Sequence, residues 1–531
     1  MRAILIFWGL FCASLTYAQS FNFTQSPIMS DATATSITLS WKASKNATEG
    51  TIYWGNQPNN LTNTLSINPA DSSFTIPNLS PATVYYIRLK LTHQSTVIQS
   101  DTQPYITSST SSGEMKVYFN YSVNSSFSNG SIPEATSSTD LETNIVNQIL
   151  AATSTIDICM YNVNRNTYIY ALKQVASQGV TVRYIAESDR TNYSLHNNTL
   201  NFPVLYADAS GIMHDKFLII DRDLPEKATV VMGSYNFTNS NLYQGYNNMI
   251  SIQDQSLAEI YTLEFEEMWG SSEDQPSLST SRIGNAKTDN TPHTVFINGT
   301  KVESYFSPSD HTTSHIIDAI QTADTDLRFG LLAFTNNDLE NAIFDLSIPV
   351  KGLIEEQYNG TETAQFQAKG FSIYDFEESG HFLHHKYGIV DAQSPDSDPI
   401  LITGSHNWTY SAEKYNDENT LIIHDADIAN IFLQEFEARW KTIVAIEKVN
   451  NHPQIRIYPN PARKIIHLQN NMTTLQTVSI INCLGKQMSQ QVLQPNEQKT
   501  LDIRDFPEGI YFLLLSQNQG ITASEKLLIT H

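Results

Sequence analysis

Hydrophobic and polar residues alternate in four short runs within residues 20–108. The runs read SITLSWKAS, EGTIYWG, SSFTIPNL and TVYYIRLKL, and turn-forming residues separate them. Alternation with a period of two predicts strands that bury one face, and short strands joined by turns favour an antiparallel arrangement. We therefore expect a small antiparallel β-sandwich here, followed by a polar, small-residue linker at residues 109–114.

A longer mixed pattern then occurs twice, in residues 115–275 and again in residues 295–445. The first copy runs through KVYFNYS, TDLETNIVNQILAA, TIDICMYNV and HDKFLIID, and the second through VESYFSPS, TSHIIDAIQTA, LRFGLLAFT and HHKYGIVD. Apolar strand runs and helical runs follow one another in the same order in both copies. A repeated mixed pattern predicts a duplicated α/β fold whose two halves pack against each other.

The end of the chain, residues 454–531, returns to short strand runs. These are IRIYPNPA, VSIINCLGKQM, FPEGIYFLLL and SEKLLIT, interrupted by Pro, Gly and Asn. They predict a small C-terminal β-sandwich. With 531 residues and three patterns of different kind, we expect a multidomain protein.

The first residues, MRAILIFWGLFCASLTYAQS, combine an early arginine, an apolar stretch and a small-residue end. This order predicts a signal peptide over residues 1–18 and an exported protein. Cys12 would leave with the signal, so that only Cys159 and Cys483 remain and no disulfide framework is expected. No later apolar run reaches the roughly 18 residues that a membrane span needs, so none is predicted.

Charge bears on the partners of the protein. The chain has 54 Asp and Glu against 31 Lys and Arg, a formal net charge of -23. Proteins that bind nucleic acid through its phosphates usually carry the opposite sign, so the balance counts against a large basic groove. It does not exclude a small site with local positive charge.

The most informative segments are MHDKFLIID and LHHKYGIVD, which begin at Met213 and Leu383. Residues two apart on a strand share a face, so each motif histidine is expected beside the lysine two positions on, with the intervening residue on the other face. This spacing makes His384, and not His385, the equivalent of His214. Asp221 and Asp391 fall at odd spacing from the histidines and are expected to cap or brace the strand.

A second repeated element follows each motif as Gly-Ser-x-Asn. Glycine permits close backbone approach, and Ser and Asn offer neutral hydrogen-bonding groups to phosphate oxygens. A neutral imidazole can attack the phosphorus of an anionic diester, and a protonated imidazole can donate to the leaving oxygen. Lysine and asparagine side chains would stabilise the charge that grows on the phosphoryl oxygens.

These residues resemble the phospholipase D superfamily, whose signature H-x-K-x4-D followed by G-S-x-N occurs twice around one active site. The resemblance implies a metal-free hydrolysis of phosphodiesters through a phosphohistidine, with no cofactor, in which His214 is the nucleophile and His384 the acid; the sequence leaves the reverse assignment open. The candidate catalytic residues are His214, Lys216, Asp221, His384, Lys386 and Asp391, and the candidate phosphate-binding residues are Ser234, Asn236, Ser405 and Asn407.

The two copies differ at one position. Glu418, fourteen residues after Gly404, matches the carboxylate that orients a catalytic histidine in this family, and Asn247 occupies the corresponding place after Gly233. We treat both as candidate orienting residues. Because an amide stabilises an imidazolium less than a carboxylate does, we expect Asn247 to tune His214 differently from His384.

Two further resemblances concern the ends of the chain. Trp41 and the series Leu79-x-Pro81-x-Thr83-x-Tyr85 are similar to a fibronectin type III domain with its tyrosine corner. The YPNP opening and the G-x-Y strand of residues 454–531 resemble the C-terminal sorting domain of the type IX secretion system. That resemblance implies a protein exported by a Bacteroidetes-type bacterium, released or kept at the cell surface, with the secretion machinery as a partner.

The substrate remains open between two classes. A phospholipase that releases lipid head groups is favoured over a nuclease because residues 116–441 contain 18 Lys and Arg against 43 Asp and Glu. The stretch GSHNWTYSAEKYNDEN, however, resembles the small bacterial nucleases of the superfamily. A third interpretation is a non-catalytic surface protein that keeps the phosphate pocket and binds a surface or glycan ligand through its N-terminal module. His381, His384 and His385 also raise a metal site, but Lys386 would repel a cation and no metal is expected.

Overall fold

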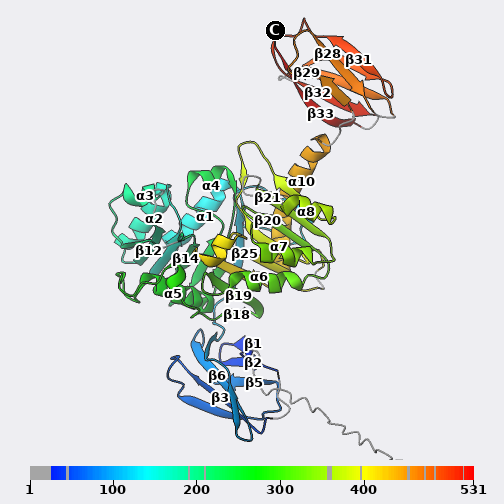
Figure 1. The fold of residues 1–531 in the computed structure, drawn as a ribbon. Helices are drawn as coiled ribbons and strands as arrows, with labels where there is room; N and C mark the ends of the chain where they lie inside the picture. The colour runs from blue at the N-terminus through cyan, green and yellow to red at the C-terminus, as the bar shows by residue number, and fades with distance from the viewer. Residues whose placement is uncertain are drawn as a thin grey trace, which may run out of the picture.

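The computed structural model describes residues 26–42, 47–188, 192–208, 211–355, 362–394, 397–450, 455–471, 474–482, 486–517 and 520–530. The expected signal peptide, Cys12 and Cys483 lie outside these residues. Figure 1 shows a β-rich N-terminal region (blue), a central α/β body, and a β-rich C-terminal region (orange to red) that follows the long helix α10 (Ala426–Asn450).

The N-terminal region consists of two antiparallel sheets that contribute to one hydrophobic core. The first sheet has the order β1-β2-β5 and the second β4-β3-β6-β7, with β8 also paired to β6. Trp41, Ile52, Tyr85 and Leu89 are among the residues of the core between them. The strand bounds are β1 Ile28–Thr33, β2 Ser36–Ser40, β3 Glu49–Gly55, β4 Asn63–Ile67, β5 Ser73–Pro77, β6 Val84–His93, β7 Thr96–Gln99 and β8 Gln103–Ile106.

Residues 109–114 contact the first half of the central body directly. The Ser109 hydroxyl donates to the Asp254 carboxylate, the Ser112 amide donates to the Gln253 side chain at 2.8 Å, and the Gly113 amide donates to the Gln253 carbonyl at 3.1 Å. The stretch predicted as a linker is therefore held against the body by several hydrogen bonds.

The first half of the body is an eight-stranded mixed sheet of order β10-β9-β17-β15-β14-β11-β12-β13. Strands β11, β12 and β13 run parallel, and β14, β15, β17 and β9 alternate in direction. The strands are β9 Met115–Phe119, β10 Ala135–Thr136, β11 Thr155–Met160, β12 Thr181–Glu187, β13 Val204–Ala207, β14 Lys216–Ile220, β15 Thr229–Gly233 and β17 Asn248–Gln253. The helices are η1 Ser125–Phe127, α1 Ser138–Ala151, α2 Asn166–Ser177, α3 Tyr193–His196, α4 Asn239–Tyr243 and α5 Gln255–Trp269.

The second half repeats this sheet as β18-β19-β26-β25-β24-β20-β21-β22. The strands are β18 Thr294–Ile297, β19 Thr300–Ser307, β20 Leu327–Leu331, β21 Val350–Glu355, β22 Ser372–Phe376, β24 Lys386–Val390, β25 Ile400–Gly404 and β26 Glu418–Ile423. The helices are α6 Thr312–Gln321, α7 Asn337–Phe344, α8 Glu362–Ala368, α9 Tyr410–Lys414 and α10, and the turn η2 (Gly284–Ala286) lies in the connection between the halves. The predicted repetition of strands and helices is confirmed.

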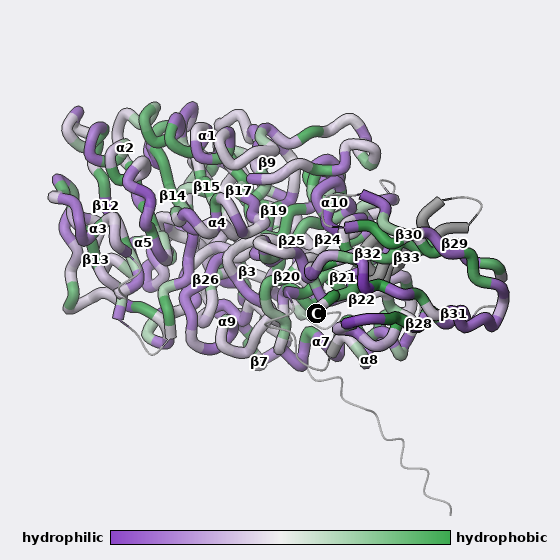
Figure 2. The backbone as a smooth tube through the Cα atoms, turned by 90° about the horizontal axis from the view of Figure 1, so that it is seen from above, coloured by the Kyte–Doolittle hydropathy of each residue, from purple (hydrophilic) through white to green (hydrophobic). Residues whose placement is uncertain are grey.

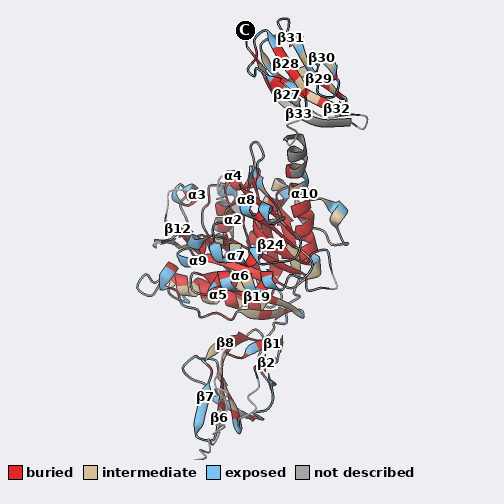
Figure 3. Cartoon of the chain, turned by 45° about the vertical axis from the view of Figure 1, so that its right-hand side comes forward, coloured by how far each residue is buried: buried red, intermediate tan, exposed pale blue. Residues whose placement is uncertain are grey.

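The two halves share a core. Phe217 and Ile219 of β14 lie in the same buried cluster as Tyr387 and Ile389 of β24, together with apolar residues of α5 and α10. The opposite face of each sheet packs against the helices of its own half. The central strands are accordingly hydrophobic in Figure 2 and buried in Figure 3. Burial on both faces explains why the motif strands read as continuous apolar runs.

The C-terminal region again has two sheets around one core, β27-β28-β31 and β30-β29-β32-β33. Its strands are β27 Ile455–Tyr458, β28 Ile465–Asn470, β29 Gln476–Asn482, β30 Gln487–Leu493, β31 Gln498–Asp502, β32 Gly509–Gln517 and β33 Gly520–Ile529. Among the described residues of the whole chain, no helix has the length and apolar character of a membrane span.

Candidate active site at the junction of the two halves

Each motif histidine lies where its half meets the other half. Met213 forms a parallel bridge with Asp417, and the His214 amide donates to the Asp417 carbonyl at 2.9 Å. In the related position, β16 (Gly245–Tyr246) pairs in parallel with β23 (Phe382–Leu383), and the His384 amide donates to the Tyr246 carbonyl at 3.1 Å. Both histidines come two residues before the first residue of their strand, outside the strand in which they were expected.

The side chains that orient the histidines come from the opposite half. The Nδ1 atom of His214 lies 2.7 Å from Oε2 of Glu418, and Nδ1 of His384 lies 2.8 Å from Oδ1 of Asn247. The expectation that Asn247 tunes His214 was therefore wrong. The bridge between Met213 and Asp417 and the pairing of β16 with β23 each bring the segment after one Gly-Ser-x-Asn element beside the motif of the other half. Each orienting side chain therefore contacts the histidine of the other half.

Hydrogen bonds around Asn247 define the tautomer of His384. The Asn247 amide nitrogen donates to the carbonyls of Asn241 and Gly245, at 3.0 and 3.1 Å, so its oxygen faces His384. An amide oxygen only accepts, and Nδ1 of His384 must therefore carry the proton. In each histidine the Nδ1–H bond leaves Nε2 as the nitrogen available for chemistry.

Burial and nearby charge lower the pKa values of both histidines. Burial lowers the pKa of His214 to about 4, although the Glu418 carboxylate acts in the opposite direction. Burial, followed by the positive charges of Lys386 and Lys216, lowers the pKa of His384 well below its ordinary value. No carboxylate is among the main influences on the pKa of His384. The two imidazoles therefore differ because His214 contacts the charged Glu418 and His384 contacts the neutral Asn247.

Lys216 and Lys386 are fully or almost fully buried beside the histidines. Their ammonium groups donate to the carbonyls of His214 and His384, at 2.5 and 2.7 Å. Burial lowers the pKa of Lys216 to about 7 and that of Lys386 well below its ordinary value, and for Lys386 the charge of Lys216 adds to the effect. A bound anion would stabilise the charged form of both lysines, so the site favours an anion.

Asp221 and Asp391 lie at the far ends of the motif strands. The Asp221 carboxylate accepts hydrogen bonds from the amides of Thr153, Ser154 and Thr155. The Asp391 carboxylate does the same for residues 324–326. Both residues have positive φ, 51° and 53°, at the turn that follows the strand. They brace the neighbouring loop, as their spacing indicated. They do not lie with the histidines, so the prediction that they belong to the catalytic residues was wrong.

The Gly-Ser-x-Asn elements contain two kinds of contact. The Ser234 hydroxyl donates to Asn247 Oδ1 at 3.0 Å and accepts from the Asn248 amide at 3.1 Å, and the Ser405 hydroxyl accepts from the Asn419 amide at 3.0 Å. The serines thus support the orienting segments. By contrast, Oδ1 of Asn236 and of Asn407 is buried without a hydrogen-bond partner among the described residues. An amide oxygen accepts hydrogen bonds, so these two oxygens call for a donor, and the asparagines would meet a phosphate through their Nδ2 groups.

Gly233 and Gly404 are required by close backbone contact. A Cβ atom would lie 2.3 Å from the Asn248 carbonyl oxygen at Gly233, and 2.0 Å from that of Asn419 at Gly404. Side chains at these positions would push away the segments that contain Asn247 and Glu418.

Sequence reasoning missed a pair of glutamates. Glu187 ends β12 and accepts from the Met213 amide at 2.6 Å, while Glu355 ends β21 and accepts from the Leu383 amide at 2.5 Å. Each therefore contacts the residue before a motif histidine. The signal was present in the sequence, because both copies end this strand with a glutamate.

Three other histidines near the motifs, His381, His385 and His406, contact other residues than the motif histidines. His385 is buried against Asn248 and Glu435, and His381 contacts the rings of Tyr121 and Tyr246. His406 is buried with its Nε2 3.9 Å from Glu413. Within the described ranges, no group of three or more His, Cys, Asp or Glu has the arrangement of a metal site.

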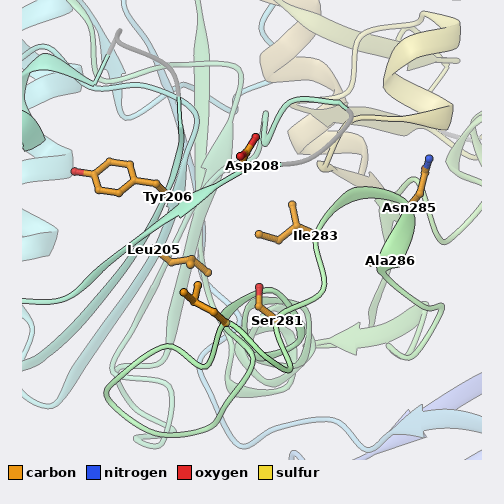
Figure 4. Close-up of a pocket in the computed structure, with 8 residues that line it drawn as sticks. Leu205, Tyr206, Asp208, Ser281, Ile283, Asn285 and Ala286 are labelled. Carbon is orange, nitrogen blue, oxygen red and sulfur yellow. The ribbon is translucent and has the colours of Figure 1, made fainter.

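A surface pocket of about 460 Å³ lies between the end of β13 and the connection between the halves (Figure 4). Leu205, Tyr206 and Asp208 come from the β13 side. Ile283, Asn285 and Ala286 come from the connection and flank Gly284, whose amide donates to the Asp417 carboxylate at 2.7 Å. The pocket therefore borders the part of the connection that contacts Asp417, and Asp417 in turn contacts His214.

Two models of known protein families match parts of the chain. A family model described as "Cardiolipin synthase, PLD-like domain" matches residues 145–269 and again residues 316–440. The duplicated region belongs to the phospholipase D superfamily. A second model, the secretion system C-terminal sorting domain, matches residues 456–530 and marks the chain as a secreted or cell-surface protein of a Bacteroidetes-type bacterium.

Individual relatives in the phospholipase D superfamily are similar over part of the chain. The mitochondrial cardiolipin hydrolase of Mus musculus is 32% identical over 139 residues, which is 25% of this chain and 60% of the relative. A phospholipase D of Rickettsia bellii is 26% identical over 145 residues, which is 26% of this chain and 69% of the relative.

The crystal structure of Nuc, a phospholipase D family member from Salmonella typhimurium, is 26% identical. The match has a TM-score of 0.24 and covers 27% of this chain and 95% of Nuc. The chain spans 60% of the length of the mouse cardiolipin hydrolase and 50% of that of the human one.

Proposed function

We propose that the chain is an exported phosphodiesterase that hydrolyses phosphodiester bonds of phospholipids, and so releases their head groups, through a phosphohistidine. One observation carries the proposal. The two motif histidines have their Nδ1 atoms engaged by side chains of opposite halves, beside two buried lysines whose ammonium groups donate to the backbone carbonyls of those histidines. Paired imidazoles with free Nε2 atoms and local positive charge are what a two-step transfer of a phosphoryl group requires.

In the proposed reaction, Nε2 of His214 attacks phosphorus and His384 donates a proton to the leaving oxygen. The P–N bond forms as the P–O bond to the leaving group breaks. Water then attacks the phosphohistidine, His384 accepts the proton of that water, and the P–N bond breaks. Lys216, Lys386, Asn236 and Asn407 would stabilise the charge on the phosphoryl oxygens.

Glu418 supports the assignment of His214 as nucleophile. A carboxylate on Nδ1 increases the electron density on the imidazole and stabilises the positive charge that develops when Nε2 bonds phosphorus. Asn247 gives His384 no such stabilisation, and burial keeps the pKa of His384 low. An anionic diester in the site would raise that pKa and protonate His384, and its imidazolium then loses the proton readily. That property suits protonation of a leaving alcohol.

The substrate class rests on charge and on the relatives. Residues 116–441 contain 18 Lys and Arg against 43 Asp and Glu, which disfavours a long polyanion. Two relatives that match 139 and 134 residues of this chain are named as mitochondrial cardiolipin hydrolases, which favours a lipid phosphodiester. Hydrolysis of DNA or RNA is the alternative within the same chemistry.

The test uses purified mature protein on phospholipid vesicles and on single-stranded and double-stranded DNA and RNA, with chelator present. We expect head-group release that depends on the lipid interface. Cleavage of nucleic acid without head-group release, falling steeply as salt rises, would replace the lipid proposal by the nuclease. Binding to vesicles or oligonucleotides without turnover of any diester would favour the non-catalytic surface protein.

We further propose that residues 20–108 form a fibronectin type III-like sandwich that binds a surface or glycan ligand. The Ser80 amide donates to the Tyr85 hydroxyl at 2.9 Å, the contact that a tyrosine corner makes, and two sheets surround one core. The remaining boundaries are proposed as 1–18 for the signal peptide, 109–114 for the linker, 115–275 and 295–445 for the halves, and 454–531 for the sorting domain, with the type IX machinery as partner.

A further inference from the structure

Lys287 lies in the connection between the halves and contacts both of them. Its ammonium group donates to Glu264 of α5 at 2.6 Å and to the Ser307 carbonyl of β19 at 2.8 Å, and it lies 3.2 Å from the Asp417 carboxylate. The side chains of Lys287, Glu264 and Asp417 are all buried, at 0%, 1% and 0% exposed. A buried cation with three oxygen neighbours from two halves restricts how those halves meet.

Asp417 links Lys287 to His214, because it contacts both residues. The Asp417 carboxylate also accepts from the Gly284 amide at 2.7 Å, so two groups of the connection contact it. Its backbone accepts from the His214 amide at 2.9 Å and donates to the Ile212 carbonyl at 3.0 Å. The next residue, Glu418, bonds the imidazole of His214. A shift of Asp417 would therefore move both the backbone and the ring partner of His214.

We propose that Lys287 is a positioning residue for His214, which acts through Asp417 to place the Glu418 carboxylate on the imidazole. The inference rests on the proposed function of the site, since it identifies a residue that supports the nucleophile. Neither Lys287 nor its connection recurs in the second half, so the repeated motifs do not indicate it.

Local charge explains why the loss of Lys287 would displace Asp417. Three buried carboxyl groups surround the ammonium, those of Asp215, Glu264 and Asp417. Burial raises the pKa of Glu264 to about 7 and raises the pKa of Asp417 and of Asp215, while Lys287 lowers all three. Without the ammonium these groups would have to bind protons or separate.

The His384 side is built differently. Asn120 donates through its side chain to the carbonyls of Asn241, Leu242 and Gly245, and its oxygen accepts from the Asn247 amide at 2.9 Å. Neutral amides thus place Asn247, whereas a cation and carboxylates place Glu418. A change at Lys287 is accordingly expected to affect His214 and to leave His384 unchanged.

The test compares Lys287→Met and Lys287→Arg in the full mature chain. Two quantities are measured, the pKa of His214 from the NMR titration of its ring, and kcat and KM for a chromogenic diester. If Glu418 is displaced, Lys287→Met should lower the pKa of His214, because the carboxylate raises it. Loss of a nearby positive charge alone would raise that pKa, so the sign separates positioning from simple electrostatics.

We expect Lys287→Met to lower kcat about 100-fold with little change in KM, and Lys287→Arg to recover much of the loss. Arg183→Met is the matched control, since Arg183 is a buried cation paired with Asp157 in the first half at 2.6 Å. It should reduce stability without changing the His214 titration. If Lys287→Met does not fold, Lys287→Met combined with Glu264→Gln removes one uncompensated carboxylate and should show the same lowered pKa.

An unchanged or raised pKa of His214 in the folded variant, or a kcat equal to that of the wild type, would overturn the role of Lys287. The titration needs no turnover. A wild type without diesterase activity would thus contradict the proposed function, while the His214 shift would still decide the positioning role.

Discussion

The imidazole of His214 and the carboxylate of Glu418 are 2.7 Å apart, although 204 residues separate them in the chain. The acceptor for each motif histidine is supplied by the other half of the duplicated fold. Neither half alone contains a complete histidine with its orienting partner. Each half therefore depends on the other to complete its histidine.

Glu418→Gln tests this exchange directly. The His214 contact, after the opposing effect of burial, lowers the pKa of Glu418 to about 2, so the carboxylate is charged at neutral pH. Its neutralisation should lower the pKa of His214 and reduce kcat about 100-fold, while the NMR titration of His384 stays in place. A shift confined to His384 would show that the orienting residues act within their own half.

Asn247→Glu should have the complementary effect on His384. A carboxylate on Nδ1 raises the pKa of His384, which then remains protonated to higher pH and can still donate its proton. The alkaline limb of the kcat/KM profile is expected to move upward by about 1 to 3 pH units. Asn247→Gln has the same length without the charge and serves as the control. Equal profiles for the two variants would contradict the role of His384 as the acid.

Anion binding should be coupled to proton uptake. Lys216 has a pKa of about 7 because it is buried, so at pH 8 most of its population is neutral. An anion in the site raises that pKa, and that of Lys386, and the lysines then take up protons. Calorimetric titration with sulfate in two buffers of different ionisation enthalpy should give an uptake of about one to two protons at pH 8. Sulfate that binds without proton uptake would contradict the described electrostatics.

Asp221→Ala and Asp391→Ala are expected to affect stability more than chemistry. Each change leaves three backbone amides of a loop without their acceptor. The expected loss is about 3 kcal/mol of the free energy of unfolding, measured by urea denaturation. The kcat of the folded variant should stay near that of the wild type. A large loss of kcat with unchanged stability would return the aspartates to the catalytic group.

Much of this arrangement follows from the sequence. The repeated apolar runs predicted two α/β halves, and the paired motifs predicted which histidines and lysines would come together. The odd spacing of Asp221 and Asp391 correctly indicated bracing. In each case the information is local, since it depends on strand periodicity and on residues within one motif.

The partners of the histidines could not be read from the sequence, because spacing within one copy does not say which half a side chain reaches. Asn247 was accordingly assigned to the wrong histidine. Glu187 and Glu355 carried a repeated signal that went unused. No repeated signal marks Lys287, because it lies in the connection between the halves. Its contacts form only when both halves have folded together.

The most direct test of the central claim is turnover of a chromogenic phosphodiester by the mature protein, with chelator present, beside His214→Ala and His384→Ala. We predict that the wild type turns over, that both variants fall to background, and that an alkaline quench of the wild type traps a phosphoryl group on His214. His381→Ala, outside the paired motifs, should remain active. A silent wild type, or variants as active as the wild type, would contradict a two-histidine phosphodiesterase built from both halves.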